Sequence, residues 1–359
     1  MRVTGQAARD PFTLALTGDV MLGRLVNDVV ARRGYAYPWG DMLPALRSAD
    51  LLCVNLECAL TRVTARWQGD RWKPFFFRAE PEAVETLRIA GVSFASLANN
   101  HIMDFGAAGL LETREVLTRA CIAHAGAGTD VASASQPVVL HVRGWRVAVV
   151  AFADYPEAWC ATDGAPGMCF TPVSPHAKDF TSVERAIVAA RAAADFVIFS
   201  IHWGPNLRLR PPPEFQDFAH SVLDAGADVF WGHSAHLLQG IELVDGKPVL
   251  YDTGDFVDDY AADPVLRNDF SALFLLRCAP PSVERVEIIP ALIRDMQVVR
   301  ATGPERTAIV RRLTDLSAEL GTTLTEDDGG CTVVLPRADR AGPTTRRTRV
   351  PPGSGTPSR

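Results

Sequence analysis

Long apolar runs and paired cysteines are what this chain of 359 residues lacks. A membrane-spanning helix needs about 20 consecutive apolar residues and a signal peptide roughly 7–15, and the sequence contains neither. Its seven cysteines are an odd number and include no CxxC pair, which argues against a disulfide framework. Cys160 and Cys169 bracket a short Gly/Pro loop and could in principle pair. These absences predict a cytoplasmic protein with reduced thiols and no membrane span.

Positive charge is scarce as well. The chain has 36 basic against 42 acidic residues and a formal net charge of −6, whereas nucleic-acid-binding proteins usually carry a basic excess or stripe. The single basic run, Arg337 to Arg349, lies in the C-terminal tail. We therefore expect no nucleic acid partner. Hydrophobic residues make up 47% of the chain, enough for a full core without disulfides or a structural metal.

Short apolar runs alternate with segments of helical periodicity from residue 12 onward. The runs that predict strands are Thr13–Leu16, Leu51–Leu56, Val92–Leu97, Arg146–Phe152, Phe196–Ile201, Val229–Trp231 and Val249–Tyr251. The helical patterns between them are Glu80–Ala90, Ala107–Ala120, Ser182–Ala194 and Pro213–Ala225. This alternation predicts an α/β fold, built on a largely parallel sheet or on two packed sheets.

The composition divides the chain into four parts. We expect a flexible N-terminus at residues 1–11, one domain at 12–300, a C-terminal helix and strand extension at 301–336, and a disordered tail at 337–359. The second half of the domain and the extension add two strands, a helix and a last strand, at Ser271–Arg277, Val283–Pro290, Thr307–Leu320 and Cys331–Leu335. Residues 62–79 form an aromatic and basic loop that is too irregular for a sheet strand.

Polar side chains follow the predicted strands at the point where each strand ends. Six strands are followed by an Asp, Glu, Asn or His, and these residues are Asp19, Glu57, Asn100 with His101 and Asp104, His202, His233 with His236, and Asp252 with Asp255. Because loops at the carboxyl ends of such strands converge on one edge, we expect these side chains to lie close together. Carboxylate, amide and imidazole groups are the ligands of divalent metal ions.

The number of candidate ligands favours two ions over one. One ion would be satisfied by about four protein ligands, and the edge offers Asp19, Glu57, Asn100, His202, His233 and His236. Two ions about 3.5–4 Å apart and bridged by a carboxylate suit in-line displacement at phosphorus by an activated water, and Glu57 is the candidate bridge. His101 could then protonate a leaving oxygen while Asp104 holds its other ring nitrogen.

Ordinary structural roles remain open for each residue taken alone. Asp19 could be a turn or helix-capping residue, Asn100 with its neighbour could form a left-handed turn, and His233 and His236 could share one face of a short helix without binding an ion. The pattern across six strand ends favours the metal site. Phosphate-binding loops, GxSxG, HExxH and zinc-ribbon spacings are absent from the sequence, which argues against nucleotide switches and serine hydrolases.

At these residues the sequence resembles a known family. The segments GDVMLGR from Gly18, NLECALT from Asn55, LANNH ending at His101 with DFG from Asp104, HWG from His202, and the Gly-His-x-x-His stretch are similar to those of the CapA family. Its members are poly-γ-glutamate capsule biosynthesis proteins, related to the calcineurin-like metallophosphoesterases. The resemblance covers residues 12–290 in order. It implies a four-layer α/β/β/α sandwich with two facing sheets and a dinuclear metal site.

The resemblance also implies roles for single residues. Asp19 and Glu57 match the first acidic ligands, Asn100 and His101 the Asn-His pair, and His202, His233 and His236 the histidine ligands. Arg24 stands where ordinary phosphoesterases carry another histidine, Ser234-Ala235 replaces a frequent His-Pro, and Asp255 stands where many members have Asn and adds a carboxylate near the site. Membrane-anchored members carry an N-terminal hydrophobic anchor, which is not found in this sequence.

Two functions follow as hypotheses. The first is a soluble hydrolase with two divalent ions (manganese, zinc, iron or magnesium) that uses metal-activated water on a phosphoester or a γ-glutamyl amide. The candidate groups for a small anionic or polyglutamate-like substrate are Arg24, Lys73, Arg78 and Trp203, and the aromatic residues of 62–79 either form a lid or pack that loop down. The second is a non-catalytic accessory protein on the same scaffold, which binds polyglutamate or a synthase or ligase partner.

Overall fold

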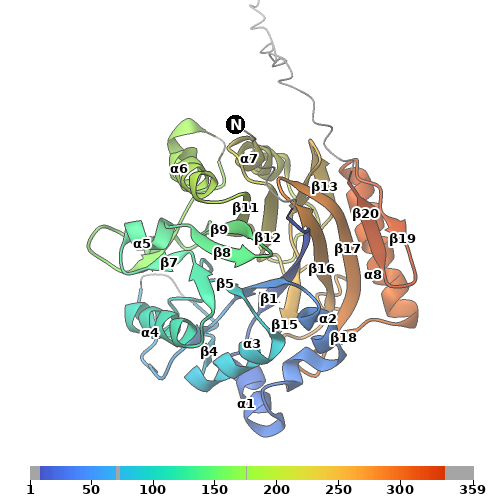
Figure 1. Ribbon diagram of the computed structural model, residues 1–359. Coiled ribbons are helices and arrows are strands. Elements are labelled where there is room, and N and C mark those ends of the chain that lie inside the picture. Colours follow the sequence, from blue (N-terminus) through green and yellow to red (C-terminus); the bar gives the residue numbers. More distant parts are fainter. Residues whose placement is uncertain (1–8, 70–72, 175, 336–359) are drawn as a thin grey trace, which may run out of the picture.

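The computed structural model describes residues 9–69, 73–174 and 176–335, and within them the chain forms a mixed α/β fold (Figure 1). The disordered tail predicted at 337–359, most of the flexible N-terminus predicted at 1–11, and Trp72 lie outside the described residues. Among the described residues no helix combines the length and apolarity required to cross a membrane. None of the seven cysteines, all of which are described, is in a disulfide, so Cys160 and Cys169 are both free thiols.

The larger sheet has ten strands and is parallel at its centre. β1 pairs in parallel with β2, β2 with β5, and β5 with β6, while β16 runs antiparallel to β1 on its other side. The short strand β15 also pairs with β1, in parallel. The strands are β1 (Phe12–Val20), β2 (Leu51–Leu56), β5 (Phe94–Ser96), β6 (Ala123–Ala125), β15 (Asp255–Val257), β16 (Phe270–Ala279), β17 (Ser282–Arg294), β18 (Gln297–Arg300), β19 (Thr325–Glu326) and β20 (Cys331–Val334).

The smaller sheet has six strands in the order β13-β14-β12-β11-β9-β8. Its four central strands are parallel and the two edge strands antiparallel. They are β8 (Val138–Val142), β9 (Trp145–Ala153), β11 (Phe196–His202), β12 (Val229–His233), β13 (Ile241–Val244) and β14 (Lys247–Leu250). Two further ladders have two strands each and consist of β3 (Ala59–Leu60) with β4 (Arg78–Ala79), and β7 (Ala127–Gly128) with β10 (Gly167–Met168).

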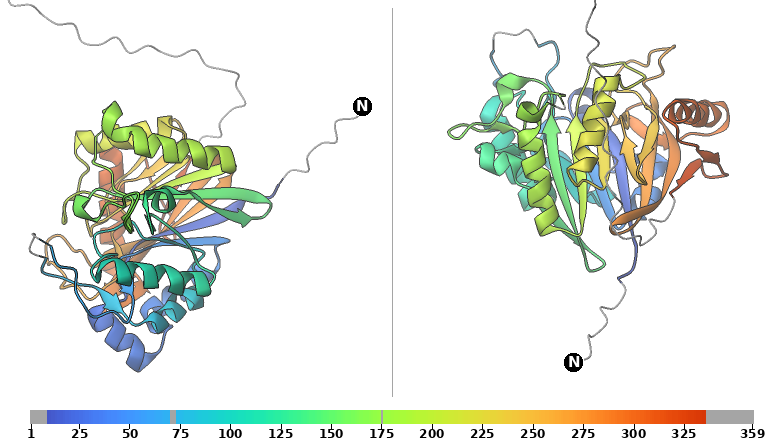
Figure 2. Two further views of the ribbon diagram at one scale, coloured as in Figure 1. Left: turned by 90° about the vertical axis from the view of Figure 1, so that its left-hand side faces the viewer. Right: turned by 90° about the horizontal axis from the view of Figure 1, so that it is seen from above.

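Eight α-helices and three short 3-10 turns of the described chain surround the sheets. The α-helices are α1 (Arg24–Arg33), α2 (Leu43–Arg47), α3 (Val84–Ala90), α4 (Gly106–Arg119), α5 (Val131–Ser135), α6 (Ala177–Ala193), α7 (Pro213–Asp224) and α8 (Gly303–Glu319). The 3-10 turns are Tyr37–Met42, Pro81–Ala83 and Glu157–Trp159. In the left view of Figure 2, α6 lies above the sheets and α4 below them.

A shared apolar core holds the two sheets together. Alternate strand side chains such as Leu14 and Leu16 of β1 and Val149 and Ile198 of the smaller sheet belong to one buried cluster, as the two-residue period of strands requires. The Trp231 indole of the smaller sheet donates to a backbone oxygen of β1 at 3.0 Å. A second cluster joins the other face of the smaller sheet to α6 and α7. The carboxyl ends of the parallel strands of both sheets therefore meet across this core.

The predicted elements lie where the sequence patterns placed them, with shifted bounds. The pattern at Ser182–Ala194 underestimates α6, which begins at Ala177, and the strand predicted at Val92–Leu97 shortens to β5. One prediction is wrong at its end: residues 62–79 do contain a short strand, β4, because its backbone pairs with β3. The last strand, β20, joins the larger sheet through β17. The division into a domain and an extension stays a prediction.

Candidate metal centre

The ends of β1, β2, β11 and β12 and the start of β15 deliver side chains to one buried cluster between the sheets. Asp19 lies near the end of β1, Glu57 directly follows β2, and Asp255 begins β15. His202 and His233 are the last residues of β11 and β12 and are paired in register across the smaller sheet. The expectation that polar residues at the strand ends converge is therefore confirmed by the geometry.

Two glycines allow the backbones to approach closely at this edge. A Cβ at Gly18 would lie 2.0 Å from the Gly254 oxygen, and this approach lets the Asp19 amide donate to that oxygen at 2.9 Å. A Cβ at Gly232 would lie 2.1 Å from the Tyr251 oxygen. Larger residues at either position would push apart the strands that carry the acidic and imidazole groups.

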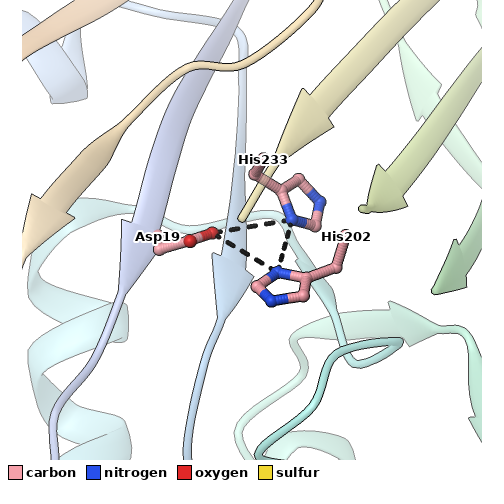
Figure 3. A group of neighbouring side chains, drawn as sticks. All are labelled: Asp19, His202 and His233. Atoms are coloured by element: carbon pink, nitrogen blue, oxygen red, sulfur yellow. Dashed lines mark hydrogen bonds and ion pairs between the residues drawn. The ribbon is translucent and has the colours of Figure 1, made fainter. Parts of the chain in front are cut away.

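The first ligand group consists of Asp19, His202 and His233 (Figure 3). The two Nδ1 atoms are 3.0 Å apart, and Asp19 Oδ1 lies 3.9 Å from that of His202 and 3.5 Å from that of His233. Donors around one ion with bonds of about 2.0–2.2 Å are separated by roughly 3–3.6 Å. Two imidazole nitrogens that face each other beside a carboxylate are the arrangement that a cation stabilises.

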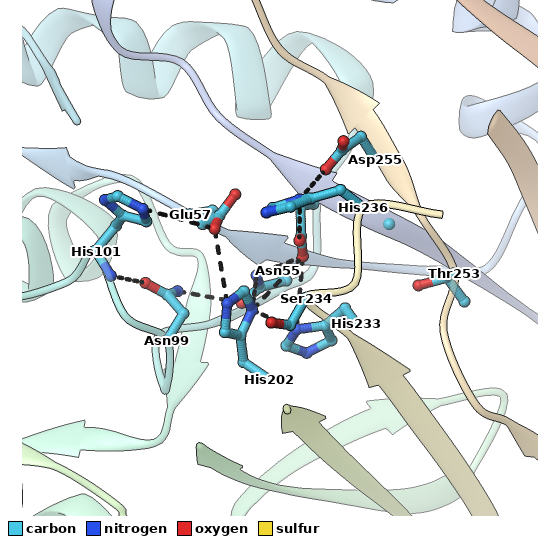
Figure 4. Close-up of polar contacts among 12 residues, drawn as sticks. Asn55, Glu57, Asn99, His101, His202, His233, Ser234, His236, Thr253 and Asp255 are labelled. Atoms are coloured by element: carbon cyan, nitrogen blue, oxygen red, sulfur yellow. Dashed lines mark hydrogen bonds and ion pairs between the residues drawn. The ribbon is translucent and has the colours of Figure 1, made fainter. Parts of the chain in front are cut away.

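The second ligand group consists of Asp19, Glu57, His236 and Asp255, of which Figure 4 labels Glu57, His236 and Asp255. His236 Nδ1 lies 2.8 Å from Asp255 Oδ1 and 3.6 Å from Asp19 Oδ2. His236 has a φ of 56° and its neighbour Ser234 a φ of 116°, a backbone conformation that L-residues seldom adopt. Asp19 is common to both groups, and Glu57 Oε1 of the second group lies 3.6 Å from His202 Nε2 of the first, so Glu57 as the bridging carboxylate stays a prediction.

Several donor atoms of this cluster are buried without a hydrogen-bond partner among the described residues. Four of them belong to the ligand groups and are Asp19 Oδ2, Glu57 Oε1, His202 Nε2 and Asp255 Oδ2; the fifth is Oδ1 of Asn100, which lines the adjacent pocket. Buried polar atoms normally have a partner, because losing water without replacement costs about 1–3 kcal/mol. Five such atoms at one place fit divalent ions, since each atom is of a type that coordinates them.

Burial shifts the pKa values of the two kinds of ligand in opposite directions. It raises the pKa of Glu57 to about 8 and, together with repulsion from Glu57 and Asp255, raises that of Asp19 well above its usual range. Burial lowers the pKa of His233 to about 3 and places that of His202 well below its usual range. His236 is the exception, because the carboxylates around it outweigh burial and raise its pKa.

His101 lies beside the ligand groups and is held by Asp104. Its Nδ1 donates to Asp104 Oδ2 at 2.7 Å, which leaves Nε2 facing the cluster, 3.9 Å from Glu57 Oε1. The Phe77 ring stacks on the imidazole with centroids 3.7 Å apart, and the Phe77 amide donates to Asp104. Burial lowers the pKa of His101 to about 4, so the resting ring is neutral near pH 7.

A pocket of about 1020 Å³ opens above the cluster. Arg24, Lys73, Asn100 and His101 line it, together with His202 and His236. The other two predicted substrate-binding residues do not line this pocket. The Arg78 guanidinium bonds Glu80 and the Thr61 oxygen, and Trp203 packs in the core with its indole donating to Tyr251.

Aromatic residues of the loop at 62–79 divide between packing and the pocket. Phe75 is 56% exposed and lines the pocket, and Phe77 lines it too although its side chain is buried, whereas Trp67 packs edge-on against Trp159. The contact between Trp67 and Trp159 fits the packed loop that the sequence left open, and the lid stays a prediction.

Several residues of the site are not among the ligands predicted from the sequence. Asp255 was noted near the site but not among the ligands, and Asp252, which also follows a strand, instead accepts from the Ala235 and Gly254 amides and stabilises that turn. The supporting residues Asn55 and Asn99 bond Asp19 and the Glu57-bearing strand end. The position of Asn55 and Asn99 beside predicted ligands is the sequence signal that could have identified these two supporting residues.

A mixed α/β protein with a buried carboxylate–imidazole cluster at its strand ends is, by class, a candidate metal-binding protein. Comparison with known proteins then gives the family. The model of the bacterial capsule synthesis protein family PGA_cap matches residues 13–260, well over half of the chain. The chain belongs to this family, which includes the CapA poly-γ-glutamate capsule biosynthesis proteins.

Named relatives cover most of the chain. A probable polyglutamine synthesis accessory protein of Mycobacterium tuberculosis (strain CDC 1551 / Oshkosh) is 29% identical, over 92% of this chain and 97% of that protein. The capsule biosynthesis protein CapA of Bacillus anthracis is 27% identical, over 85% and 73%. The PGA biosynthesis protein CapA of Bacillus subtilis (strain 168) is 28% identical, over 85% and 78%.

Proposed function

We propose that this chain is a hydrolase that binds two divalent metal ions and cleaves a phosphoester or a γ-glutamyl amide in poly-γ-glutamate metabolism. The observation that carries the proposal is the set of unpartnered, buried donor atoms in two ligand groups that share Asp19. We also propose that the two packed sheets and their helices form the four-layer sandwich of metallophosphoesterases. The cytoplasmic location predicted from the sequence stays a prediction.

The residues that would hold the ions are Asp19, Glu57, Asn100, His202, His233, His236 and Asp255. Bound divalent ions supply Lewis acidity, which lowers the pKa of water and stabilises developing negative charge. Which of manganese, zinc, iron or magnesium binds is a matter for measurement, because mixed O and N ligands accept all four.

His101 provides the proton-transfer group in this proposal. Asp104 accepts from Nδ1 and fixes the ring, so that Nε2 carries the free lone pair on the side of the cluster. Since the resting ring is neutral, Nε2 takes a proton from the attacking water first and then delivers it to the leaving atom. This order refines the acid role predicted from the sequence.

The test combines ion content with turnover. The full chain, purified without chelator, is compared with the His233→Ala/His236→Ala double variant by elemental mass spectrometry, followed by a screen of phosphoesters and γ-glutamyl peptides. We expect about two ions per chain in the wild type, loss of ions in the variant, and turnover in the wild type alone. Turnover that survives the double substitution contradicts the proposal.

The second candidate function is a non-catalytic accessory role with a synthase or ligase partner. It is favoured by the name of the Mycobacterium tuberculosis relative, a probable polyglutamine synthesis accessory protein. In that case the ions are structural, a ligase-type partner copurifies with the chain, and no substrate of the screen is cleaved.

A further inference from the structure

Asp154 is a pocket residue that neither ligand group uses. It is the first residue beyond β9, and its carboxylate lines the pocket. Oδ2 accepts from the Gly204 amide at 2.8 Å, and its own amide donates to the His202 oxygen at 3.1 Å. Within the described ranges no second residue bonds this carboxylate and no cationic side chain pairs with it. A half-buried negative charge therefore faces the pocket without a counter-charge.

The arginine and the lysine of the pocket wall differ in how far they are already paired. Lys73 Nζ donates to the Asn100 oxygen at 2.7 Å and lies 3.1 Å from Asp104 Oδ1, so its charge is used inside the protein. Arg24 pairs with Asp259 through Nε at 3.1 Å. For the terminal nitrogens of Arg24, no hydrogen-bond partner occurs in the part of the chain that the structure describes. Arg24 is thus the cation that remains open to a ligand.

Arg24 and Asp154 come from elements next to different sheets, and both line the pocket. Arg24 begins α1, which follows β1 of the larger sheet, and its guanidinium lies 5.5 Å from the ring of Phe77, which stacks on His101. Asp154 follows β9 of the smaller sheet and bonds Gly204, two residues beyond His202. A ligand in the pocket therefore meets a positive group from one element and a negative group from the other.

This pair of charges discriminates between the two substrate classes of the proposed function. The oxygens of a phosphoester would be attracted to Arg24 but repelled by the unpaired carboxylate of Asp154. A desolvated carboxylate is stabilised when the ligand brings a cation or a hydrogen-bond donor to it. Arginine in turn recognises carboxylates through its planar fork of donors.

We propose that the pocket selects a zwitterionic, peptide-like amide, with a free amine bound by Asp154 and a carboxylate bound by Arg24. This inference rests on the proposed hydrolase function and selects its amide branch. Asp154 acts as a specificity residue for the amino end of the ligand, and hydrogen bonding to Gly204 orients its carboxylate.

The test measures binding of defined probes to the full-length protein as purified. By isothermal titration calorimetry, γ-L-glutamyl-L-glutamate is compared with its N-acetylated form and with inorganic phosphate. We expect the wild type to prefer the free amine by about tenfold or more, the effect of roughly one charge-assisted hydrogen bond. Equal binding of the two dipeptides, or binding of phosphate alone, overturns the inference.

Three variants assign that preference to the named residues. Asp154→Asn keeps an oxygen for the Gly204 amide but removes the charge, so it abolishes the preference without loss of the fold. Arg24→Gln weakens both dipeptides alike. Glu157→Gln, at an exposed position three residues from Asp154, leaves the preference intact. A preference that persists in Asp154→Asn contradicts the assignment.

Binding and turnover separate this inference from the function on which it rests. Dipeptide binding with a free-amine preference but without hydrolysis refutes the hydrolase proposal and leaves the recognition pair in place. Hydrolysis of the free and acetylated dipeptides at equal efficiency supports the hydrolase proposal and refutes recognition of the free amine by Asp154.

Discussion

The two ligand groups differ in chemistry although they share Asp19. The first combines one carboxylate with the imidazoles of His202 and His233, both from the smaller sheet. The second combines three carboxylates with one imidazole, and all three carboxylates come from the larger sheet or the residue after its strand β2. One group is therefore rich in nitrogen and the other rich in oxygen, and we call them the nitrogen-rich group and the oxygen-rich group.

This difference in composition gives the two ligand groups different charges. Buried imidazoles resist protonation, so the nitrogen-rich group is neutral apart from Asp19 and suits zinc or iron. Buried carboxylates resist ionisation, so the oxygen-rich group depends more on a cation for its charge balance and suits manganese or magnesium. The pairing of Asp255 with His236 partly supplies that balance in the absence of an ion.

The largest expected effect comes from removing the residue that the groups share. Asp19→Asn should lower the ion content from about two per chain to near zero. Added metal at about 100 times its Kd should stabilise the wild type by about 2.7 kcal/mol for each ion bound and the variant hardly at all. Ion content is measured by elemental mass spectrometry and stability by thermal unfolding.

The same substitution has an opposite effect on the ion-free protein. Because repulsion from Glu57 and Asp255 and burial disfavour the charge of Asp19, the neutral amide should raise the unfolding temperature of chelator-treated protein. Asp315→Asn, at an exposed position on α8, is the matched control and should change neither quantity. A variant that binds two ions like the wild type would show that Asp19 does not join the groups.

Single-group substitutions should remove one ion and spare the other. His202→Ala removes a ligand of the nitrogen-rich group, and Asp255→Ala a ligand of the oxygen-rich group. Each variant should retain about one ion per chain, and the remaining metal should differ between them when both are offered zinc and magnesium. Identical metal selectivity in the two variants would mean that the groups act as one site.

The sequence predicted the position of the site better than its internal roles. Strand periodicity located the strand ends, because residues such as Val229 and Phe196 alternate with the side chains that face the other core. The Asp, Glu, Asn and His residues at these strand ends also indicated metal-binding ligands. That Asp19 belongs to both groups depends on the register of β1 with β15, and no local pattern encodes register across 236 residues.

The roles of residues that depend on long-range contacts could not be predicted from the sequence either. Trp203 follows a ligand in the chain but turns into the core, where it packs near Phe230 and bonds Tyr251. Asp154 follows β9 and so carries the same strand-end signal as the ligands, but that signal does not show that it lines the pocket. Whether Trp203 and Asp154 line the pocket depends on which side of the strand end faces it. The packing of the two sheets determines that side.

The pH dependence of the ion-free protein should show both groups at once. The pKa of Glu57 is raised in the folded state from about 4.5 to about 8, so its contribution to stability is present below pH 4.5 and lost as the pH rises through 8. The pKa of His233 is lowered from 6.5 to about 3, so its contribution is present above pH 6.5 and lost as the pH falls toward 3. We therefore expect the unfolding temperature of chelator-treated protein to be highest at intermediate pH. It should fall toward low pH, the His233 flank, and toward high pH, the Glu57 flank.

Substitution separates the two flanks. Glu57→Gln should flatten the fall in stability toward high pH, and His233→Phe the fall toward low pH, each without change on the other side. Thermal unfolding from pH 4 to 9 in the presence of a chelator measures both profiles. A wild-type profile that rises steadily with pH would show that the carboxylates of the oxygen-rich group are not held in a costly charged state.

The smallest expected effect concerns a residue that orients a ligand without binding an ion. Ser200 Oγ lies 3.0 Å from His233 Nε2, so it fixes the ring whose Nδ1 belongs to the nitrogen-rich group. Ser200→Ala should weaken one ion by about tenfold, the lower end for a ligand-orienting contact, and leave the other unchanged, as measured by competition with a chelating dye. Ser96→Ala is the control, because the buried Ser96 hydroxyl has no partner in the described chain. Equal effects of the two substitutions would mean that packing, rather than orientation of His233, sets the affinity of the nitrogen-rich group.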